Sequence, residues 1–130
     1  MNKPRISIEE FSKIEVSIGT VRAAERVPET DKLIKCTVDF GPKPSQNEAS
    51  ADQPEAGRDG ERDVRTIVSG VAAYTEPEAL VGRQLAYVTN LEPRVIKGIE
   101  SDGMLFAVGE GESFAFLTPD RAVPPGTSAH

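Results

Sequence analysis

The sequence predicts an all-β fold class, a small barrel of short strands with short helices and extra terminal segments. Glycine and proline are frequent, with 11 and 10 copies in 130 residues, so turns are closely spaced. Short apolar runs alternate with those turns, which is typical of short strands. Tryptophan is absent and aromatic residues make up 5%, so aliphatic side chains must fill the core. A chain of this length predicts one domain spanning residues 1–130.

The N-terminal part predicts a capped helix followed by a strand. Ser7 and Glu10 have the spacing of a capping box, and Ile8, Phe11 and Ile14 then share one helix face. Residues 15–24 alternate as a strand does, with Val16, Ile18 and either Thr20 or Val21 as candidate core positions. Gly19 interrupts this strand and predicts a bulge or a sharp bend.

Two further strands are predicted at 33–41 and 64–70, and the composition changes between them. Residues 42–63 are rich in Pro, Gly, Ser, Asp and Glu, and their only apolar residues are three alanines. Such a segment buries too little apolar surface to order itself, so we expect a flexible acidic insertion at a hairpin tip. It carries three basic and six acidic residues, which is half of the formal charge of −6.

The remaining elements complete a recognisable order. Residues 75–82 resemble a short helix with Thr75 as N-cap and Gly82 beyond its end. Strands are predicted at 84–90 and 103–109, with a possible sixth at 113–118. Three strands, a helix and two more strands are the order of the five-stranded OB-fold, a Greek-key barrel.

Residues for catalysis or metal binding are absent from the pattern. The only histidine is His130, at the end of the chain, and Cys36 has no histidine to activate it and lies in a predicted strand, where a buried or half-buried position is expected. No phosphate-binding glycine loop or metal-ligand cluster is found. We therefore expect no catalytic residue, no metal and no cofactor.

The sequence also predicts the compartment. No apolar run approaches the roughly 18 residues of a membrane span, and no signal peptide is seen at the N-terminus. A single cysteine forms no intramolecular disulfide, so nothing indicates an oxidising compartment. We expect a cytoplasmic protein without membrane association.

Residues 90–104 carry the strongest functional signal. Arg94 and Lys97 lie close together between two predicted strands and are followed by Ser101 and Gly103. Basic side chains beside small residues suit close approach to a phosphate group. The overall charge of −6 argues mildly against a nucleic-acid partner, because phosphate binders are usually basic.

The chain resembles the tRNA-binding domain of the methionyl-tRNA synthetase C-terminal (beta-subunit) family, which includes free-standing tRNA-binding proteins. The matching motifs cover nearly all of the chain except the insertion. They are Ile8-Glu-Glu-Phe-Ser-Lys-Ile-Glu-Val, Ile18-Gly-Thr-Val, Asp31-Lys-Leu, Arg65-Thr-Ile-Val-Ser-Gly-Val, Pro77-Glu-Ala-Leu-Val-Gly-Arg, Asn90-Leu-Glu-Pro-Arg, Gly98-Ile-Glu-Ser-Asp-Gly-Met and the segment 119–126.

The resemblance implies an OB-fold that binds tRNA by shape, without catalysis, and forms a homodimer through segments outside the barrel. It also implies that a separate methionyl-tRNA synthetase chain is a partner that the domain assists in trans. By motif position the RNA-facing residues are Lys32, Arg65, Asn90, Arg94, Lys97, Ser101 and Met104.

Several of these residues also have a structural interpretation. Met104 suits the core, Asn90 suits a strand end held by its own loop, and Ser101 with Gly103 suits a tight turn. The two tyrosines, Tyr74 and Tyr87, offer little for base stacking.

Two other functions stay open on the sequence. One is a peptide-binding or export-chaperone-like protein of the same fold, which an exposed apolar groove on the dimer would favour. The other is an enzyme, which a buried carboxylate pair in a deep pocket would favour. A continuous basic strip through Lys32, Arg65 and Arg94 would favour tRNA.

Overall fold

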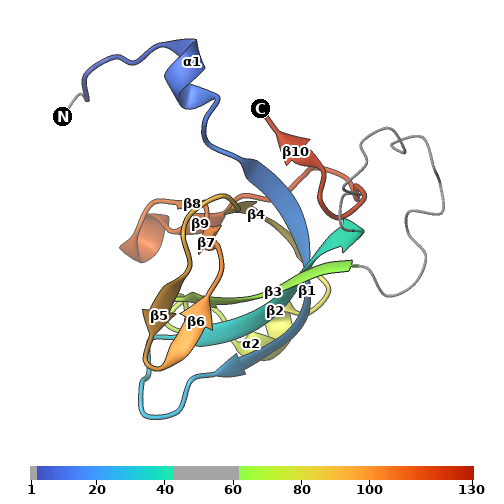
Figure 1. Ribbon diagram of the computed structural model, residues 1–130. Helices are drawn as coiled ribbons and strands as arrows, with labels where there is room; N and C mark the ends of the chain where they lie inside the picture. The colour runs from blue at the N-terminus through green and yellow to red at the C-terminus, as the bar shows by residue number, and fades with distance from the viewer. Residues whose placement is uncertain (1–2, 43–61) are drawn as a thin grey trace.

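A curled antiparallel sheet forms the body of the molecule (Figure 1). The computed structural model describes residues 3–42 and 62–130. The strands β1 (Val16–Arg26), β2 (Ile34–Pro42) and β3 (Arg62–Ser69) pair in sequence, and β4 (Gln84–Val88) pairs with the other side of β1. With β7 (Met104–Leu105) the order is β3-β2-β1-β4-β7. The sheet is therefore a meander extended from its first strand.

The sheet curls until its two ends meet. The short strand β6 (Ile99–Ser101) lies against β3, where the Val68 amide donates to the Ser101 hydroxyl at 2.9 Å. The Asp102 amide donates to the Thr66 carbonyl at 2.9 Å. The helix α2 (Pro77–Leu80) lies between β3 and β4 in sequence, as the OB-fold requires. The predicted all-β OB-fold class is confirmed.

Smaller elements decorate this barrel. The strand β5 (Arg94–Ile96) pairs with β6, and β8 (Ala107–Val108) pairs with β9 (Ala115–Phe116). A single 3-10 turn, η3 (Gly111–Ser113), connects the last two. The C-terminal strand β10 (Ser128–Ala129) pairs with the start of β1. The strand predicted at 103–109 is thus two short strands, and the one predicted at 113–118 is η3 with β9.

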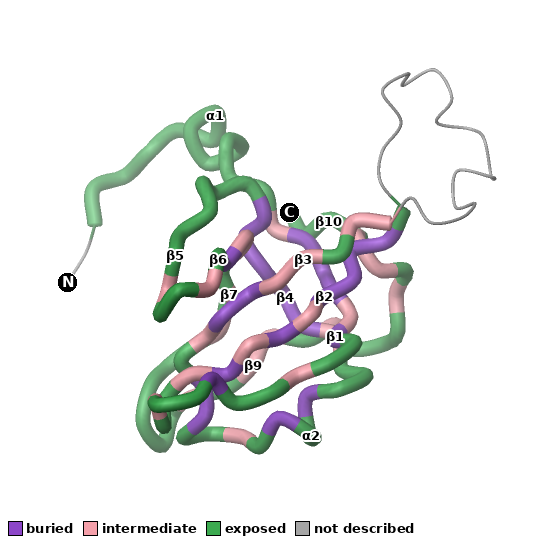
Figure 2. The backbone as a smooth tube through the Cα atoms, turned by 60° about the horizontal axis from the view of Figure 1, so that its bottom comes forward, coloured by how far each residue is buried: buried purple, intermediate pink, exposed green. Residues whose placement is uncertain are grey.

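Aliphatic residues make up most of the buried core, as the composition predicts. Figure 2 shows the buried stretches along the strands of the curled sheet. The thiol of Cys36 is buried in this core, and burial raises its pKa to about 11, so it stays protonated. The prediction of a buried cysteine is confirmed. The most deeply buried apolar side chains are Val21, Ile34, Val38, Ile67, Leu80, Leu85 and Tyr87.

The first helix, α1 (Ile8–Phe11), lies outside the barrel (Figure 1). Its cap is confirmed, because the Ser7 hydroxyl accepts a hydrogen bond from the Glu10 amide at 3.1 Å. The apolar face of Ile8, Phe11 and Ile14 is exposed rather than packed on the core. An exposed apolar helix face is the kind of surface that a partner covers.

The second helix, α2, begins differently from the prediction. Its N-cap is Glu76 rather than Thr75, and no side chain caps it. The Thr75 hydroxyl instead donates to the Glu76 carbonyl at 3.3 Å. Pro77 takes the first helical position, where its fixed φ favours the helix and its missing N–H costs nothing.

The bulge in β1 is also displaced from the predicted position. Gly19 pairs regularly with Leu85, and the register shifts between Val21 and Ala23 instead. Gly19 serves close packing, because a Cβ there would meet Val38 and would lie 2.7 Å from Phe40 Cε1. The predicted core positions Ile18 and Val21 are buried, and Val16 is half-buried.

The predicted insertion at 42–63 is shorter in the structure. Pro42 ends β2, while Arg62 and Asp63 begin β3, and Pro42 pairs with Arg62. The rest of the predicted insertion, residues 43–61, lies outside the described residues.

Candidate nucleic-acid interface

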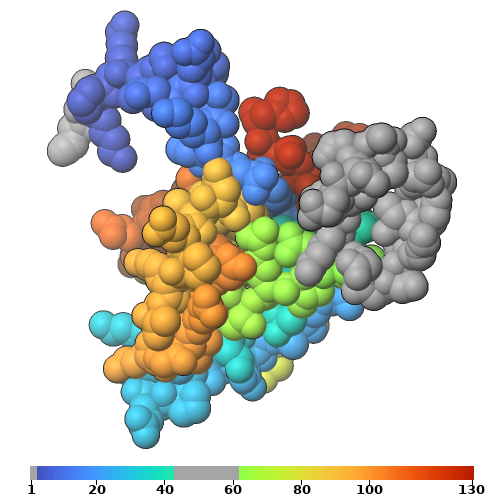
Figure 3. All heavy atoms as spheres, in the orientation of Figure 1, coloured from blue at the N-terminus to red at the C-terminus, as the bar shows by residue number. Residues whose placement is uncertain are grey.

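A β-hairpin projects from the barrel at the segment with the strongest sequence signal. Arg94 pairs with Ser101 at its base, and Lys97 with Gly98 forms the two-residue turn at its tip. Both turn residues have positive φ, 51° for Lys97 and 79° for Gly98. Figure 3 shows this hairpin, in yellow and orange, as a ridge on one face of the molecule. The sequence pattern predicted a basic loop here and missed the two strands.

Two clefts meet at the base of this hairpin. The first, of about 440 Å³, is lined by Arg94, Ser101 and Met104 together with Leu91 and Glu92. The second, of about 330 Å³, shares Arg94 and Met104 and extends over the end of β3. Met104 is 43% exposed, so its interpretation as a core residue is wrong. Arg94 is exposed and has no ion-pair partner among residues 3–42 and 62–130.

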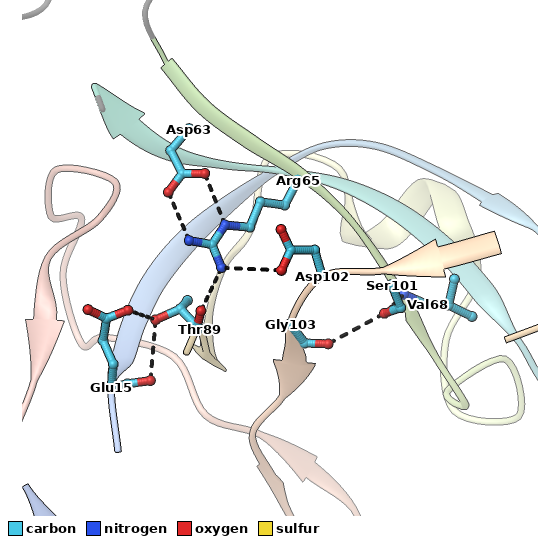
Figure 4. Close-up of polar contacts among 8 residues, drawn as sticks. All are labelled: Glu15, Asp63, Arg65, Val68, Thr89, Ser101, Asp102 and Gly103. Atoms are coloured by element: carbon cyan, nitrogen blue, oxygen red, sulfur yellow. Dashed lines mark hydrogen bonds and ion pairs between the residues drawn. The ribbon is translucent and has the colours of Figure 1, made fainter. Parts of the chain in front are cut away.

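Arg65 lines neither of these clefts, and its guanidinium is bound by other groups of the protein (Figure 4). Its Nε and Nη2 contact the two carboxylate oxygens of Asp63 at 2.9 and 3.1 Å, and its Nη1 donates to the Thr89 carbonyl at 2.7 Å. The hydrogen bond to Asp63 raises the pKa of Arg65 above its ordinary value. The guanidinium also lies 5.3 Å from the centre of the Phe40 ring. Arg65 therefore joins the start of β3 to the end of β4.

Ser101 and Gly103 form the tight turn that their alternative interpretation predicts. Ser101 is 4% exposed, and its hydroxyl accepts from the Val68 amide and donates to the Gly103 carbonyl at 3.4 Å (Figure 4). Gly103 has a φ of 145°, and a Cβ there would lie 2.8 Å from Ile67 Cδ1. Both residues close the barrel directly beneath Arg94 and Met104.

Asn90 connects the barrel to the N-terminal segment. Its Oδ1 accepts from the Glu15 amide at 2.8 Å, and its Nδ2 donates to the Lys13 carbonyl at 2.6 Å. The neighbouring Thr89 amide donates to the Glu15 carbonyl at 2.9 Å. Asn90 thus holds a distant segment, whereas its alternative interpretation predicted contacts within its own loop.

Lys32 lies on the loop between β1 and β2 and is exposed. Its carbonyl accepts from the Ala72 amide at 3.1 Å, which fixes this loop beside Gly70 and Val71 at the edge of the second cleft. The Lys32 side chain has no ion-pair partner within the described part of the chain. The structure therefore brings Arg94, Ser101 and Met104 to one cleft and Lys32 to the border of the other.

A third cleft is apolar and lies near the chain termini. It measures about 320 Å³ and is lined by residues from α1, β1, β4 and the C-terminal segment, including Phe11, Ile18, Ala86, Phe106, Leu117 and Pro119. Exposed Ile6, Ile8 and Ile14 extend the same apolar character along the N-terminal segment.

Metal and membrane sites are not seen in the described part of the chain. No group of three or more His, Cys, Asp or Glu side chains is placed to hold a metal ion there. Within residues 3–42 and 62–130, no helix has the length and apolar character to cross a membrane.

Comparison with known proteins identifies the family. A family model described as "Putative tRNA binding domain" matches residues 58–128, which is more than half of the chain. The chain belongs to the tRNA-binding domain family. This confirms the resemblance read from the motifs, and the family is a non-catalytic binding module, as expected.

Individual relatives agree with this tRNA-binding domain assignment. The methionine–tRNA ligase of Methanoregula boonei is 44% identical over 124 residues, which are 95% of this chain and 15% of that ligase. The chain thus spans about a seventh of the length of such curated relatives.

Solved structures match nearly the whole chain. A MetRS-related protein from Pyrococcus horikoshii has 32% identity and a TM-score of 0.77, with 98% of this chain and all of that chain covered. The chaperone CsaA of Bacillus anthracis has 25% identity and a TM-score of 0.73, with coverage of 98% and 100%.

Proposed function

We propose that residues 1–130 form one tRNA-binding domain that recognises tRNA by shape, in the cytoplasm, and assists a methionyl-tRNA synthetase. The family match and the 44% identity to a methionine–tRNA ligase support this proposal. Capturing tRNA in trans raises its local concentration at a synthetase without adding new specificity. Residues 43–61 are proposed as an acidic insertion in this domain.

The exposed basic side chains around the two clefts carry the proposal. Arg94 at the base of the hairpin and Lys97 at its tip belong to one rigid element, and Lys32 borders the second cleft from another loop. Lys97 occupies a left-handed position that Asn or Gly would fill more easily. Backbone strain of this kind is concentrated at functional sites.

The predicted site residues then divide into two roles. Lys32, Arg94 and Lys97 contact phosphates, and Met104 gives an apolar contact beside them. The other three are positioning residues, because their polar side-chain atoms already form hydrogen bonds within the protein. These residues are Ser101, Asn90 and Arg65. Ser101 fixes the base of the hairpin, Arg65 joins β3 to the end of β4, and Asn90 fixes the N-terminal segment.

Titration of bulk tRNA at several salt concentrations tests this function. Neutralised phosphates release counterions, so log affinity falls linearly with log salt. Arg94→Ala makes that slope shallower by about one and lowers the affinity for all tRNAs about equally. Arg121→Ala is the matched control, because Arg121 is 81% exposed and its one ion pair within residues 3–42 and 62–130 is with Asp120. If micromolar tRNA is not bound in low salt, the proposed function is wrong.

A second copy of the chain is the occupant we propose for the apolar cleft near the termini. Its lining by Phe11 and Phe106, with exposed Ile8 and Ile14 beside it, gives the apolar character of a homodimer interface. Phe106→Glu would place a charge in that interface. Size-exclusion chromatography with light scattering then gives a monomer for this variant and a dimer for the original chain. Equal masses would exclude this face.

Peptide binding is the second candidate function, favoured by the likeness to CsaA and by the same apolar cleft. Fluorescence anisotropy with labelled apolar peptides distinguishes the two. The chaperone-like function would be favoured if the original chain binds the peptides but not tRNA, and if Phe106→Glu no longer binds the peptides.

A further inference from the structure

The second cleft at the hairpin base has an aromatic wall that the basic residues do not explain. It is lined by the end of β3 and the β7–β8 segment, and Phe114 lines it together with Arg94 and Met104. Phe114 is half-buried, and it directly follows η3, outside the hairpin. From the sequence, base stacking was considered only for Tyr74 and Tyr87, which offered little, and the phenylalanines were not considered.

The Phe114 ring is held in one orientation. Tyr74 stacks on it with ring centroids 4.1 Å apart and an interplanar angle of 6°. Phe116 meets it edge-on at 5.0 Å and 87°. The Tyr74 hydroxyl accepts from the Gly111 amide at 3.2 Å, which fixes the outer ring as well. A ring supported in this way presents a preformed apolar surface to the cleft.

The same cleft also has an apolar contact and a charged side chain with no ion-pair partner in the described part of the chain. Met104 is 43% exposed, and its flexible thioether suits contact with a flat aromatic ligand. Arg94 is exposed at the rim, and the loop that carries Lys32 borders the Gly70 side. A flat apolar group with a negative charge beside it is the ligand that this arrangement fits.

We propose that this cleft takes one unpaired nucleobase of a bound RNA, with the base packed between Phe114 and Met104 and its phosphate on Arg94. This rests on the proposed function and names the RNA feature that the site recognises. The cleft volume of about 330 Å³ is near the lower limit of small-ligand pockets, so it suits a single base. Every base has an aromatic face, so such a pocket tolerates any sequence and is compatible with recognition by shape.

Two RNA hairpins that differ by one bulged nucleotide test the proposal. The bulged RNA binds the original chain more tightly than the fully paired RNA, by roughly 5- to 150-fold. Phe114→Leu keeps an apolar side chain and loses that preference, with an unchanged salt slope because no phosphate contact is lost. Val108→Ala is the control, since Val108 is an exposed apolar residue of β8 that neither lines the cleft nor belongs to the Phe114 cluster. It keeps the preference.

Other outcomes separate the site from the function. Equal binding of both hairpins, with tRNA still bound, overturns the nucleobase site and leaves the tRNA-binding function standing. If the original chain binds no RNA, both the nucleobase site and the tRNA-binding function are overturned. Displacement of the bulged RNA by an apolar peptide, with no preference over paired RNA, assigns the cleft to a peptide instead. Met104→Ala, at an exposed position, gives the same readout if Phe114→Leu does not fold.

Discussion

Ser101 joins the two ends of the curled sheet through one hydroxyl group. This hydroxyl accepts a hydrogen bond from the Val68 amide, which a backbone carbonyl would accept in a regular strand pair. Ser101 is 4% exposed. Ser101→Ala leaves that buried amide without its partner, so we expect the free energy of unfolding to fall by about 1–3 kcal/mol. Urea denaturation measures this, with exposed Ser113→Ala as the control.

The same variant decides how Ser101 serves RNA. If Ser101 only positions the hairpin, the folded variant binds tRNA with an unchanged slope of log affinity against log salt. The measured affinity is first corrected for the fraction of unfolded protein. Lost affinity at full stability would mean that the Ser101 hydroxyl contacts RNA directly.

Asp39 is a buried carboxylate shared by two arginines. Arg22 contacts it from the bulge in β1, and Arg62 contacts it at 3.0 Å from beside the second register shift. Burial alone would raise the pKa of Asp39, but hydrogen bonds from the Gly41 amide, Arg62 and Arg22 outweigh burial and lower it. The bulges thus direct both guanidinium groups to one carboxylate at the β2–β3 end.

The lowered pKa of Asp39 makes part of the stability depend on pH. A depressed carboxyl pKa contributes stability that is fully present above the unfolded value, about 3.9, and is lost as pH falls through the folded value. Asp39→Asn therefore lowers the free energy of unfolding at pH 7 by about 1–3 kcal/mol. The difference from the original chain shrinks below pH 4. Asp120→Asn, at 87% side-chain exposure, is the control; a constant difference at all pH values would contradict this account.

At the scale of elements, the β5–β6 hairpin carries a charged residue at a turn position where a side chain lowers its stability. Lys97 has a φ of 51°, where a side chain with a Cβ is strained and Asn is better tolerated. Lys97→Asn is expected to raise the free energy of unfolding by a few tenths to about 1 kcal/mol, while tRNA affinity falls. Lys97→Arg keeps both the strain and the charge, so its affinity stays close to the original. Equal affinity for the two variants would remove Lys97 from the RNA surface.

The same hairpin shows how far the sequence predicts elements. The strands of the meander were predictable because their alternation reports burial on one face, and α1 was predictable from the Ser7 cap. The hairpin was not, because β5 is mostly exposed and Lys-Gly is a weaker turn signal than Asn-Gly. Gly19 was assigned to a bulge because sequence cannot separate a bend from close packing against Phe40.

The candidate site was predictable only in its local part. Arg94 and Lys97 are close in sequence, so their closeness in space follows from spacing, although the hairpin that carries them does not. The contact of Asn90 with Lys13 spans 77 positions, and no local pattern reports it. Phe114 reaches the cleft only because β8 and β9 fold back, which depends on the tertiary structure.

At the scale of the whole molecule, charge and connectivity link the two proposed surfaces. Thr89 and Asn90 hold the N-terminal segment, and Arg65 holds Thr89. The apolar cleft proposed for a second copy and the basic residues proposed for RNA therefore share one hydrogen-bonded frame. The formal charge of −6 acts against RNA on this frame, and half of it lies in residues 43–61.

Replacing residues 43–61 by a short Gly-Ser linker tests the effect of that charge. Pro42 and Arg62 are paired neighbours, so a linker of about four residues closes the hairpin. Removing a net charge of −3 is expected to strengthen tRNA binding at low salt, because phosphate repulsion falls. The gain disappears at high salt, where charges are screened within a few ångströms. A variant of unchanged length, with the five acidic residues of 43–61 replaced by Asn and Gln, separates charge from length. If that variant binds like the original chain at low salt while the linker variant binds more tightly, bulk rather than charge opposes RNA.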